Sequence, residues 1–255
     1  MQTGTGNPYF SVVVTSRNDD HGGDMLCRMN IFTETLIGQL ARYRVPSELI
    51  FVEWNPPADR PPLREALSWP ADRYPCDVRF VEVPPEVHSR FRHAQALPLF
   101  QMIAKNVGIR RASGDFVLAT NVDILFSDAL VRHIAARRLS AGRMYRMDRH
   151  DVRETVPVNG TLDERLAFCN DRQNLLRVCE RGGTRDARTG EIDVIFPNHL
   201  ALWARKTFAR MFPDDAMRRY NMTPDNAEQF YRFHKSIGRL HTNACGDFTM
   251  MSRED

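Results

Sequence analysis

Asp123 is the residue that most clearly points to chemistry, because it stands between two apolar segments. Before it, Phe116–Ala119 is a short apolar run typical of a strand buried on both faces, and apolar residues resume at Ile124–Phe126. A buried carboxylate is costly unless it is paired or binds a cation. At the carboxyl end of a strand in an open α/β sheet, it would face the crevice where ligands bind. We therefore predict a functional role for Asp123, since Ser127 and Asp128 are better caps for the next helix.

A helix is predicted just before this strand, and it carries basic groups and an amide. It contains Lys105, Asn106 and Arg110 and stops at Ser113-Gly114, since glycine accepts the left-handed conformation of a helix end. One carboxylate and the oxygens of a diphosphate together form a normal site for Mg²⁺ or Mn²⁺. Such a cation acts as a Lewis acid that neutralises a departing diphosphate. The residues thus favour Asp123 as a metal ligand and Mn²⁺ or Mg²⁺ as the cofactor.

Strands and helices alternate four times in the first half of the chain. This alternation predicts an α/β fold with a mostly parallel sheet and helices on both faces. The carboxyl ends of parallel strands share one edge of the sheet, where a site is expected. The predicted strands are Tyr9–Thr15, Leu49–Trp54, Val78–Val83 and Phe116–Ala119, and the ends that line the edge are Thr15–Asp19, Glu53–Asn55 and Asn121–Asp123.

The second half is less regular, and we divide the chain into a regular α/β half, residues 1–150, and a less regular region, residues 151–255. Asp24 is the predicted cap of the helix after the first strand. Residues 181–191 are polar and predicted to form a mobile loop. Further predicted elements are helices at Ser127–Leu139, Leu162–Val178, Asn198–Met211 and Asn226–His234, and strands at Arg143–Met147 and Ala244–Met251.

Composition describes an ordinary globular protein of 255 residues, with 42% hydrophobic and 26% charged residues. The formal net charge of +3 is too small to indicate a nucleic-acid partner. Five scattered cysteines without a C-x-x-C pair favour reduced thiols in a cytoplasmic protein. No signal sequence and no apolar run near the ~20 residues of a membrane span is present, so we expect a soluble protein.

The common cofactor and hydrolase motifs are absent. No G-x-G-x-x-G or Walker-type loop follows a predicted strand, and neither H-E-x-x-H nor G-x-S-x-G occurs. Residues 182–185 (GGTR) resemble the phosphate loop of sugar nucleotidyltransferases, but that loop should follow the first strand. We interpret them as a surface turn.

Three motifs occur in order: SVVVTSRND at the first strand, LIFVEWN at the second, and AKNVGIRRASGDFVLATNVD, which ends in the acidic motif. Together they resemble the motifs of the GT-A glycosyltransferases of the bacterial family-2 type. The resemblance covers roughly residues 9–147 and implies a single GT-A domain with a Rossmann-like sheet. Residues 1–150 would be its nucleotide-sugar-binding half, and residues 151–255 a helical acceptor-side region. The ending HTNACGDFTMMSRE resembles the strand that borders the acceptor pocket in this family.

By position, the resemblance assigns Asp123 to the metal, directly or through water. Thr15, Arg17 and Glu53 would lie near the base and ribose, although the first two could be ordinary loop residues and Glu53 could pair with an arginine. Asn106 could be a helix residue without a role. The implied nucleotide-binding residues are Thr15, Arg17, Glu53, Lys105, Asn106 and Asn121.

Two departures from the family pattern matter. The family's Asp-x-Asp reads Asn121-Val122-Asp123 here, which weakens the expected metal affinity. An inverting enzyme of this type also needs a carboxylate base for the acceptor hydroxyl. The resemblance places it near the end of the chain, so the candidates are Asp247, Glu254 and Asp255, unless the sequence is truncated. We take Asp247 as the catalytic candidate; bonding to nearby backbone is its alternative role.

The sequence therefore predicts a metal-assisted, inverting glycosyltransferase. A UDP- or GDP-linked sugar would be the donor, and a glycan or lipid-linked hydroxyl the acceptor, in bacterial surface polysaccharide or lipopolysaccharide synthesis. Peripheral contact with the inner face of the membrane is expected, and no nucleic acid. The alternative is a non-catalytic nucleotide-sugar-binding module with the same fold. A sugar-1-phosphate nucleotidyltransferase is disfavoured because no Gly-rich loop follows Val14.

Overall fold

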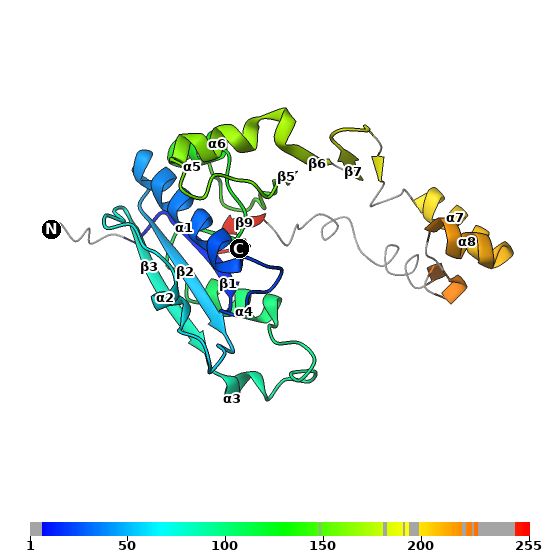
Figure 1. The fold of residues 1–255 in the computed structure, drawn as a ribbon, viewed down its shortest axis with the longest axis horizontal. Helices are drawn as coiled ribbons and strands as arrows, with labels where there is room; N and C mark the ends of the chain where they lie inside the picture. Colours follow the sequence, from blue (N-terminus) through cyan, green and yellow to red (C-terminus); the bar gives the residue numbers. More distant parts are fainter. Residues whose placement is uncertain are drawn as a thin grey trace. The chain divides into compact units, whose positions relative to one another are not determined.

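The structure is a computed structural model that describes residues 7–147, 149–180, 183–190, 192–193, 199–220, 223–225, 227–228 and 248–255. The described residues form two compact units (Figure 1). Those of the first lie within Met1–Met147, Glu154–Asn174 and Cys245–Asp255, and those of the second within Asp148–Arg153 and Leu175–Ala244. The chain therefore leaves the first unit and later returns to it.

The first unit is built on a five-stranded sheet of order β3-β2-β1-β4-β9. The first four strands along the chain are parallel, and β9 runs antiparallel to β4. The predicted α/β architecture with a mostly parallel sheet is confirmed. The strands are β1 (Phe10–Ser16), β2 (Ser47–Trp54), β3 (Cys76–Val83), β4 (Phe116–Thr120) and β9 (Phe248–Ser252).

Helices cover both faces of this sheet, which is why its central strands are apolar throughout. Successive side chains of a strand alternate between the faces. Val12 and Val14 of β1 accordingly pack in the core that contains helices α1 (Met25–Arg42) and α5 (Asp128–Ala135). Val13 packs on the other side, in the core that contains α4 (Gln101–Ile109). Helices α2 (Leu63–Ala66) and α3 (Pro85–His88) are short, and α6 (Leu162–Asn170) contacts α1.

A glycine lets α4 lie close on the sheet. A Cβ atom at Gly108 would overlap Val13 Cγ1 of β1 and would come within 3.0 Å of Val52 Cγ2 of β2. Any larger residue would force α4 away from the strands. The backbone of α4 is thereby fixed relative to β1 and β2.

Glu48 ties the amino-terminal edge of the sheet together. Its buried carboxylate accepts hydrogen bonds from Ser11 Oγ (2.6 Å), Ser113 N (2.6 Å) and Arg79 Nη1 (2.6 Å). Burial by itself raises the pKa of Glu48, but the hydrogen bonds from these three residues outweigh it and hold the pKa below its ordinary value. The network joins β1, β2, β3 and the turn before β4.

The second unit contains a four-stranded antiparallel sheet of order β5-β6-β7-β8, which the sequence analysis does not predict. The elements are β5 (His150–Val152), β6 (Leu175–Glu180), β7 (Gly183–Asp186), β8 (Ile192–Asp193), α7 (His199–Met211) and α8 (Pro213–Tyr220). The predicted helical character is found in two helices, α7 and α8. Ala209 of α7 and Ala216 of α8 form a small core together with Ala227, which follows both helices in the chain.

Three boundaries differ from the predictions. Residues 143–147 do not form a strand, because among them Tyr145 alone makes a bridge, to Met250. The predicted helix 162–178 ends at Asn170, and strand β6 begins at Leu175. The side chains of Asp171 and Asn174 bond to nearby backbone groups, which competes with helix formation. The predicted loop 181–191 is wrong for the four residues of β7.

Smaller differences concern helix ends. The helix predicted to reach residue 139 ends at Ala135, and Arg137 then takes a left-handed conformation (φ 55°). Asp24 does not cap α1 with its side chain; Asp20 Oδ1 accepts from Met25 N at 3.0 Å instead. Of the helix predicted at 226–234, only residues 227–228 lie among those described. In the described parts of the chain, no helix combines the length and apolarity that a membrane span requires.

Candidate functional site

The carboxyl ends of β1, β2 and β4 lie along one edge of the sheet, as predicted. Strands β2 and β3 extend to one side of β1, and β4 and β9 to the other, so the strand order reverses between β1 and β4. Connections on opposite faces leave a crevice at such a point, and ligands of open α/β proteins bind there. The chain segments that follow β1 and β4 are therefore the first place to search for a site.

Asp123 lies in the turn after β4 and forms an ion pair with α1. Its Oδ2 accepts a hydrogen bond from Arg28 Nη1 at 3.0 Å, and the side chains of both residues are about one-third exposed. Nη2 of Arg28 donates to the carbonyl of His21 in the β1–α1 loop (3.0 Å). An ion pair with this exposure contributes at most about 1 kcal/mol to stability. Its charges remain accessible to a ligand.

Asn121, two residues earlier, is bound by α4 on the other face of the sheet. Its Oδ1 accepts from Lys105 Nζ at 2.7 Å and from Gln101 Nε2 at 2.9 Å. Lys105 is 3% exposed. Asn106 follows Lys105 on α4. Consecutive residues of a helix point about 100° apart, and Asn106 is exposed. The structure thus brings Lys105 and Asn121 together, while Asn106 does not join them.

The β1–α1 loop has an unusual backbone. Asp20, Gly22, Gly23 and Asp24 all have positive φ angles, of 56°, 77°, 77° and 48°. Aspartate tolerates this region better than most residues, but each non-glycine still costs on the order of 1 kcal/mol. Such conformations cluster at ligand sites, and here they lead the chain to the position where the carbonyl of His21 meets Arg28.

The polar residues at the end of β1 differ in accessibility. Thr15 is buried, and its hydroxyl donates to the Val52 carbonyl at 2.9 Å, so it joins two strands and does not face solvent. Arg17 lies in the loop and pairs with Asp19 at 3.5 Å. Asn18 is 2% exposed; its Nδ2 donates to the Pro61 carbonyl at 2.9 Å, but its Oδ1 has no hydrogen-bond donor among the described residues.

Glu53, at the end of β2, is turned toward the next loop. Both of its oxygens accept from the backbone N–H of Leu63, at 2.9 and 3.0 Å, at the start of α2. Burial raises the pKa of Glu53, and the nearby charge of Glu82 raises it further. The structure does not place Glu53 beside Asp123 or Lys105, and no arginine bonds to it among the described residues.

The candidate bases occupy different places. Asp247 lies outside the described residues. Strand β9 begins at Phe248, which pairs with Thr120 at the carboxyl end of β4, and runs to Ser252, which pairs with Phe116 at the amino end. Because β9 is antiparallel, Glu254 and Asp255 follow at the edge of the sheet opposite to Asp123. Asp255 there accepts from Gly142 N at 2.8 Å.

The donor set at the Asn121–Asp123 turn does not fit a metal held by protein ligands. Both of its oxygen-bearing side chains already bond to cations, Arg28 and Lys105. At 4 Å, two unit charges repel by about 4 kcal/mol at an effective dielectric constant of about 20, and a divalent ion doubles this. Nor do three His, Cys, Asp or Glu side chains gather into a metal-binding group anywhere in the described residues.

Sequence reasoning missed Arg28 and Gln101. Arg28 is close to the start of α1 and immediately precedes Met29, which lies on the buried face of that helix. A basic side chain at this position in the helix after β1 could therefore have been expected near the edge of the sheet. Gln101 opens α4 one helical turn before Lys105, on the same face. The four-residue spacing of Gln101 and Lys105 can be seen in the sequence, but the contact of both side chains with Asn121 depends on the fold.

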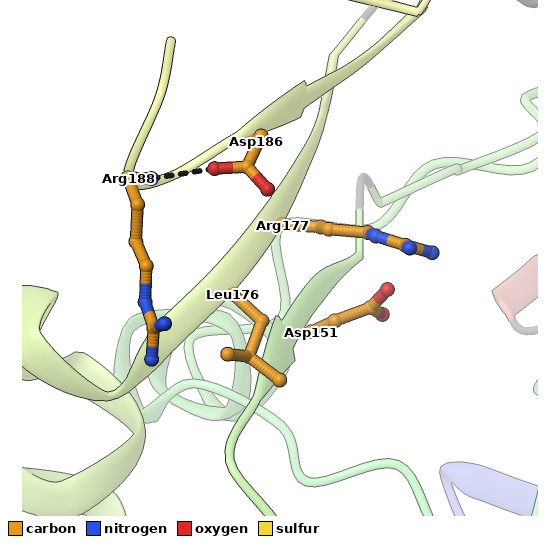
Figure 2. Close-up of a pocket in the computed structure, with 5 residues that line it drawn as sticks. All are labelled: Asp151, Leu176, Arg177, Asp186 and Arg188. Carbon is orange, nitrogen blue, oxygen red and sulfur yellow. Dashed lines mark hydrogen bonds between the residues drawn. The ribbon is translucent and has the colours of Figure 1, made fainter. Parts of the chain in front are cut away.

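A separate pocket lies in the second unit. Its volume is about 290 Å³, and it is lined by Asp151, Leu176, Arg177, Asp186 and Arg188 (Figure 2). Asp186 Oδ1 accepts from the backbone N–H groups of Arg188 and Thr189, at 2.8 Å each, and these bonds lower the pKa of Asp186. The carboxylate therefore closes a turn, and the pocket contains none of the predicted site residues.

Comparison with known proteins gives little guidance. No family model matches the chain, and no curated protein matches it in sequence. A solved structure to which it is similar is the mannosyltransferase PcManGT from Pyrobaculum calidifontis, in complex with GDP-Man and Mn²⁺. The TM-score is 0.32 and the identity 18%, over 51% of this chain and 32% of that chain, so the chain spans about a third of the mannosyltransferase. A similarity this weak does not assign an activity, and the family-2 resemblance stays a prediction.

Proposed function

We propose that this protein is a glycosyltransferase that moves a sugar from a nucleoside-diphosphate donor, UDP- or GDP-linked, to an acceptor hydroxyl. The observation that supports this most is the pair of contacts after β4, Arg28 with Asp123 and Lys105 with Asn121. They place two cations at the reversal point of a doubly wound sheet, where a diphosphate would be bound. The order of the three sequence motifs gives independent support.

The proposed reaction is a direct displacement at the anomeric carbon of the donor sugar. The acceptor oxygen forms the new bond, the bond to the diphosphate breaks, and a carboxylate takes the hydroxyl proton. We propose Asp247 as this base from its position in the sequence, just before the strand that pairs with β4. Residues 1–150 would hold the donor and residues 151–255 would contribute the acceptor side.

Donor turnover tests the proposal. Purified protein, incubated with UDP- and GDP-sugars, should release nucleoside diphosphate, and Asp123→Ala should reduce the release by at least tenfold. The control is Asp163→Ala, because Asp163 is also an aspartate paired with an arginine of α1 (Arg42 Nη1, 2.7 Å) but lies on α6. Equal loss in both variants, or no release from any donor with any acceptor fraction, would contradict the proposal.

The cofactor is tested separately. Mn²⁺ or Mg²⁺ at Asp123 is predicted from the sequence, but in this structure such an ion would lie beside the guanidinium of Arg28. Turnover measured in EDTA and during titration with each ion shows whether the reaction uses it.

A non-catalytic nucleotide-sugar-binding module is the second candidate. Two observations favour it. Asn121 stands where the family pattern has its first aspartate, and the carboxylate of Glu53 is bonded to the backbone of Leu63. In that case nucleotides would bind, as shown by a thermal shift, but no donor would be consumed under any metal condition.

The membrane partner is also proposed. Three apolar side chains, Leu97, Met102 and Ile103, are exposed on or just before α4 (49%, 66% and 36%), and Arg90 and Arg92 are exposed nearby in the chain. Apolar and basic groups together favour an anionic lipid surface. Such contact would bring a lipid-linked acceptor of surface polysaccharide synthesis to the protein at the inner face of the membrane. Sedimentation with anionic and neutral vesicles tests it.

A further inference from the structure

We infer that Arg28 and Lys105 stand in for the divalent cation, so that the site binds the diphosphate of its donor without a metal. The inference rests on the proposed function and departs from the cofactor that the sequence predicts. It assigns phosphate binding to Arg28, which no sequence motif indicates, and changes the role of Asp123 from metal ligand to the partner that positions Arg28.

The carboxylate of Asp123 already has a cationic partner. Its Oδ2 accepts from Arg28 at 3.0 Å, so a metal ion bound to Asp123 would lie beside the guanidinium and be repelled by its charge. Arg28 is held from a second side by the His21 carbonyl, in a loop whose neighbouring glycines have φ of 77°. A Cβ atom at Gly22 would come within 3.0 Å of Arg28 Nη2. The loop is therefore shaped around the guanidinium.

The side-chain oxygen of Asn121 is also occupied by donors of the protein. A carbonyl oxygen has two lone pairs, and those of Asn121 Oδ1 are directed to Lys105 Nζ and Gln101 Nε2, at 2.7 and 2.9 Å. The oxygen that would replace the missing carboxylate as a metal ligand thus faces an ammonium group. Both positions of the acidic motif now bear cations supplied by the protein.

Arg28 has a hydrogen-bond donor that could serve a ligand. Its Nε–H is buried and meets no acceptor among the described residues, while the side chain as a whole is 35% exposed. A guanidinium has five N–H donors in a planar fork that matches phosphate oxygens. A small rotation from Asp123 toward a bound diphosphate would let Arg28 satisfy Nε and retain an anionic partner.

The experiment measures binding of UDP and GDP by calorimetry, in EDTA and in excess Mn²⁺. We expect at least one of them to bind in EDTA, with a Kd within about threefold of that in Mn²⁺. Arg28→Gln should raise the Kd in EDTA by about tenfold, the loss of one charge-assisted hydrogen bond. Arg28→Lys, which keeps the charge but loses Nε, should fall between the two.

Arg42→Gln is the matched control. Arg42 lies on the same helix, is 33% exposed and pairs with Asp163 at 2.7 Å, so it reports the cost of losing an ion pair on α1 away from the site. Its Kd should stay within about twofold of wild type. Asp123→Asn should still bind in EDTA, because Asp123 ligates no metal under this inference.

The outcomes separate the inference from the proposed function. Binding in Mn²⁺ that disappears in EDTA and in Asp123→Asn would overturn the inference and leave the proposed function standing. An unchanged Kd in Arg28→Gln would also overturn it. If neither nucleotide binds in either condition, the proposed function fails and takes the inference with it.

Discussion

Two glutamates of β2 show how surroundings decide the behaviour of one side chain. Glu48 and Glu53 are both about 2% exposed. Glu48 receives hydrogen bonds from several donors, one of them the guanidinium of Arg79, which favour the charged form. Glu53 receives only the backbone N–H of Leu63 among the residues that the structure describes, so burial prevails and favours the neutral form.

The raised pKa of Glu53 predicts a pH-dependent stability. In the unfolded chain Glu53 ionises at its ordinary value, whereas the folded protein retains the proton to higher pH. The free energy of unfolding should therefore fall as the pH rises between these two values, by about 1.4 kcal/mol for each unit that separates them. Glu53→Gln keeps an acceptor for Leu63 N–H and cannot ionise, so its stability should lack this decline.

Urea unfolding at steps from about pH 4 to about pH 8 measures the difference. Glu86→Gln, which changes an exposed glutamate of α3, serves as the control and should keep the wild-type profile. Parallel profiles for wild type and Glu53→Gln would show that burial does not control this carboxyl.

At the scale of elements, α4 is the part of the fold on which the site depends. It carries Lys105 and Gln101, and Gly108 sets its distance from the sheet one turn later. The sequence predicts this helix from its periodicity and its stop at Ser113-Gly114. It cannot predict the close approach, because that depends on where Val13 and Val52 of other elements lie.

Gly108→Ala should destabilise the protein, although alanine is the better helix former. The helical preference is worth about 1 kcal/mol, and the overlap with Val13 costs about 1–3 kcal/mol unless α4 moves away. Movement would carry Lys105 from Asn121, so affinity for UDP or GDP should fall together with the midpoint of urea unfolding.

Gly38→Ala on α1 is the matched control. Within the described part of the chain, its Cβ would meet only Leu162 Cδ2, at 3.5 Å, an ordinary contact. This variant should be as stable as wild type or more so by up to about 1 kcal/mol, with unchanged nucleotide affinity. A loss in both variants would indicate that glycine in any helix of this protein is sensitive, independent of α4.

At the scale of the whole molecule, the first unit is completed by a strand from the far end of the chain. Phe248 of β9 is 3% exposed and packs edge-on against Phe126, with ring centroids 5.7 Å apart. Phe248→Ala should lower the free energy of unfolding by about 3–5 kcal/mol. Phe212→Ala, at a residue 49% exposed in the second unit, should change it by less than about 0.5 kcal/mol. Chemical denaturation compares them, and similar effects would contradict the role given to β9.

Features that depend on local sequence could be predicted, whereas features that depend on contacts between distant parts of the chain could not. The strands near residues 10, 50, 80 and 118 are local apolar runs, and their parallel arrangement follows from the helices between them, so both were predicted correctly. Asp123 was singled out for the same local reason. Its pairing with Arg28 depends on a left-handed loop path that composition does not encode. In the second unit, β7 (Gly183–Asp186) is polar and has no apolar periodicity to reveal it. Strand β6 (Leu175–Glu180) does contain apolar residues, but its short run was assigned to the helix that precedes it.

The antiparallel pairing of β9 with β4 also bears on how the protein is made. During translation β4 emerges long before Phe248, and until then one side of it offers unpaired N–H and C=O groups. Such an open edge is where a partly synthesised chain can pair wrongly with other chains. The turn that bears Asn121 and Asp123 follows directly from that open strand, and it gains its final support only when synthesis has passed β9.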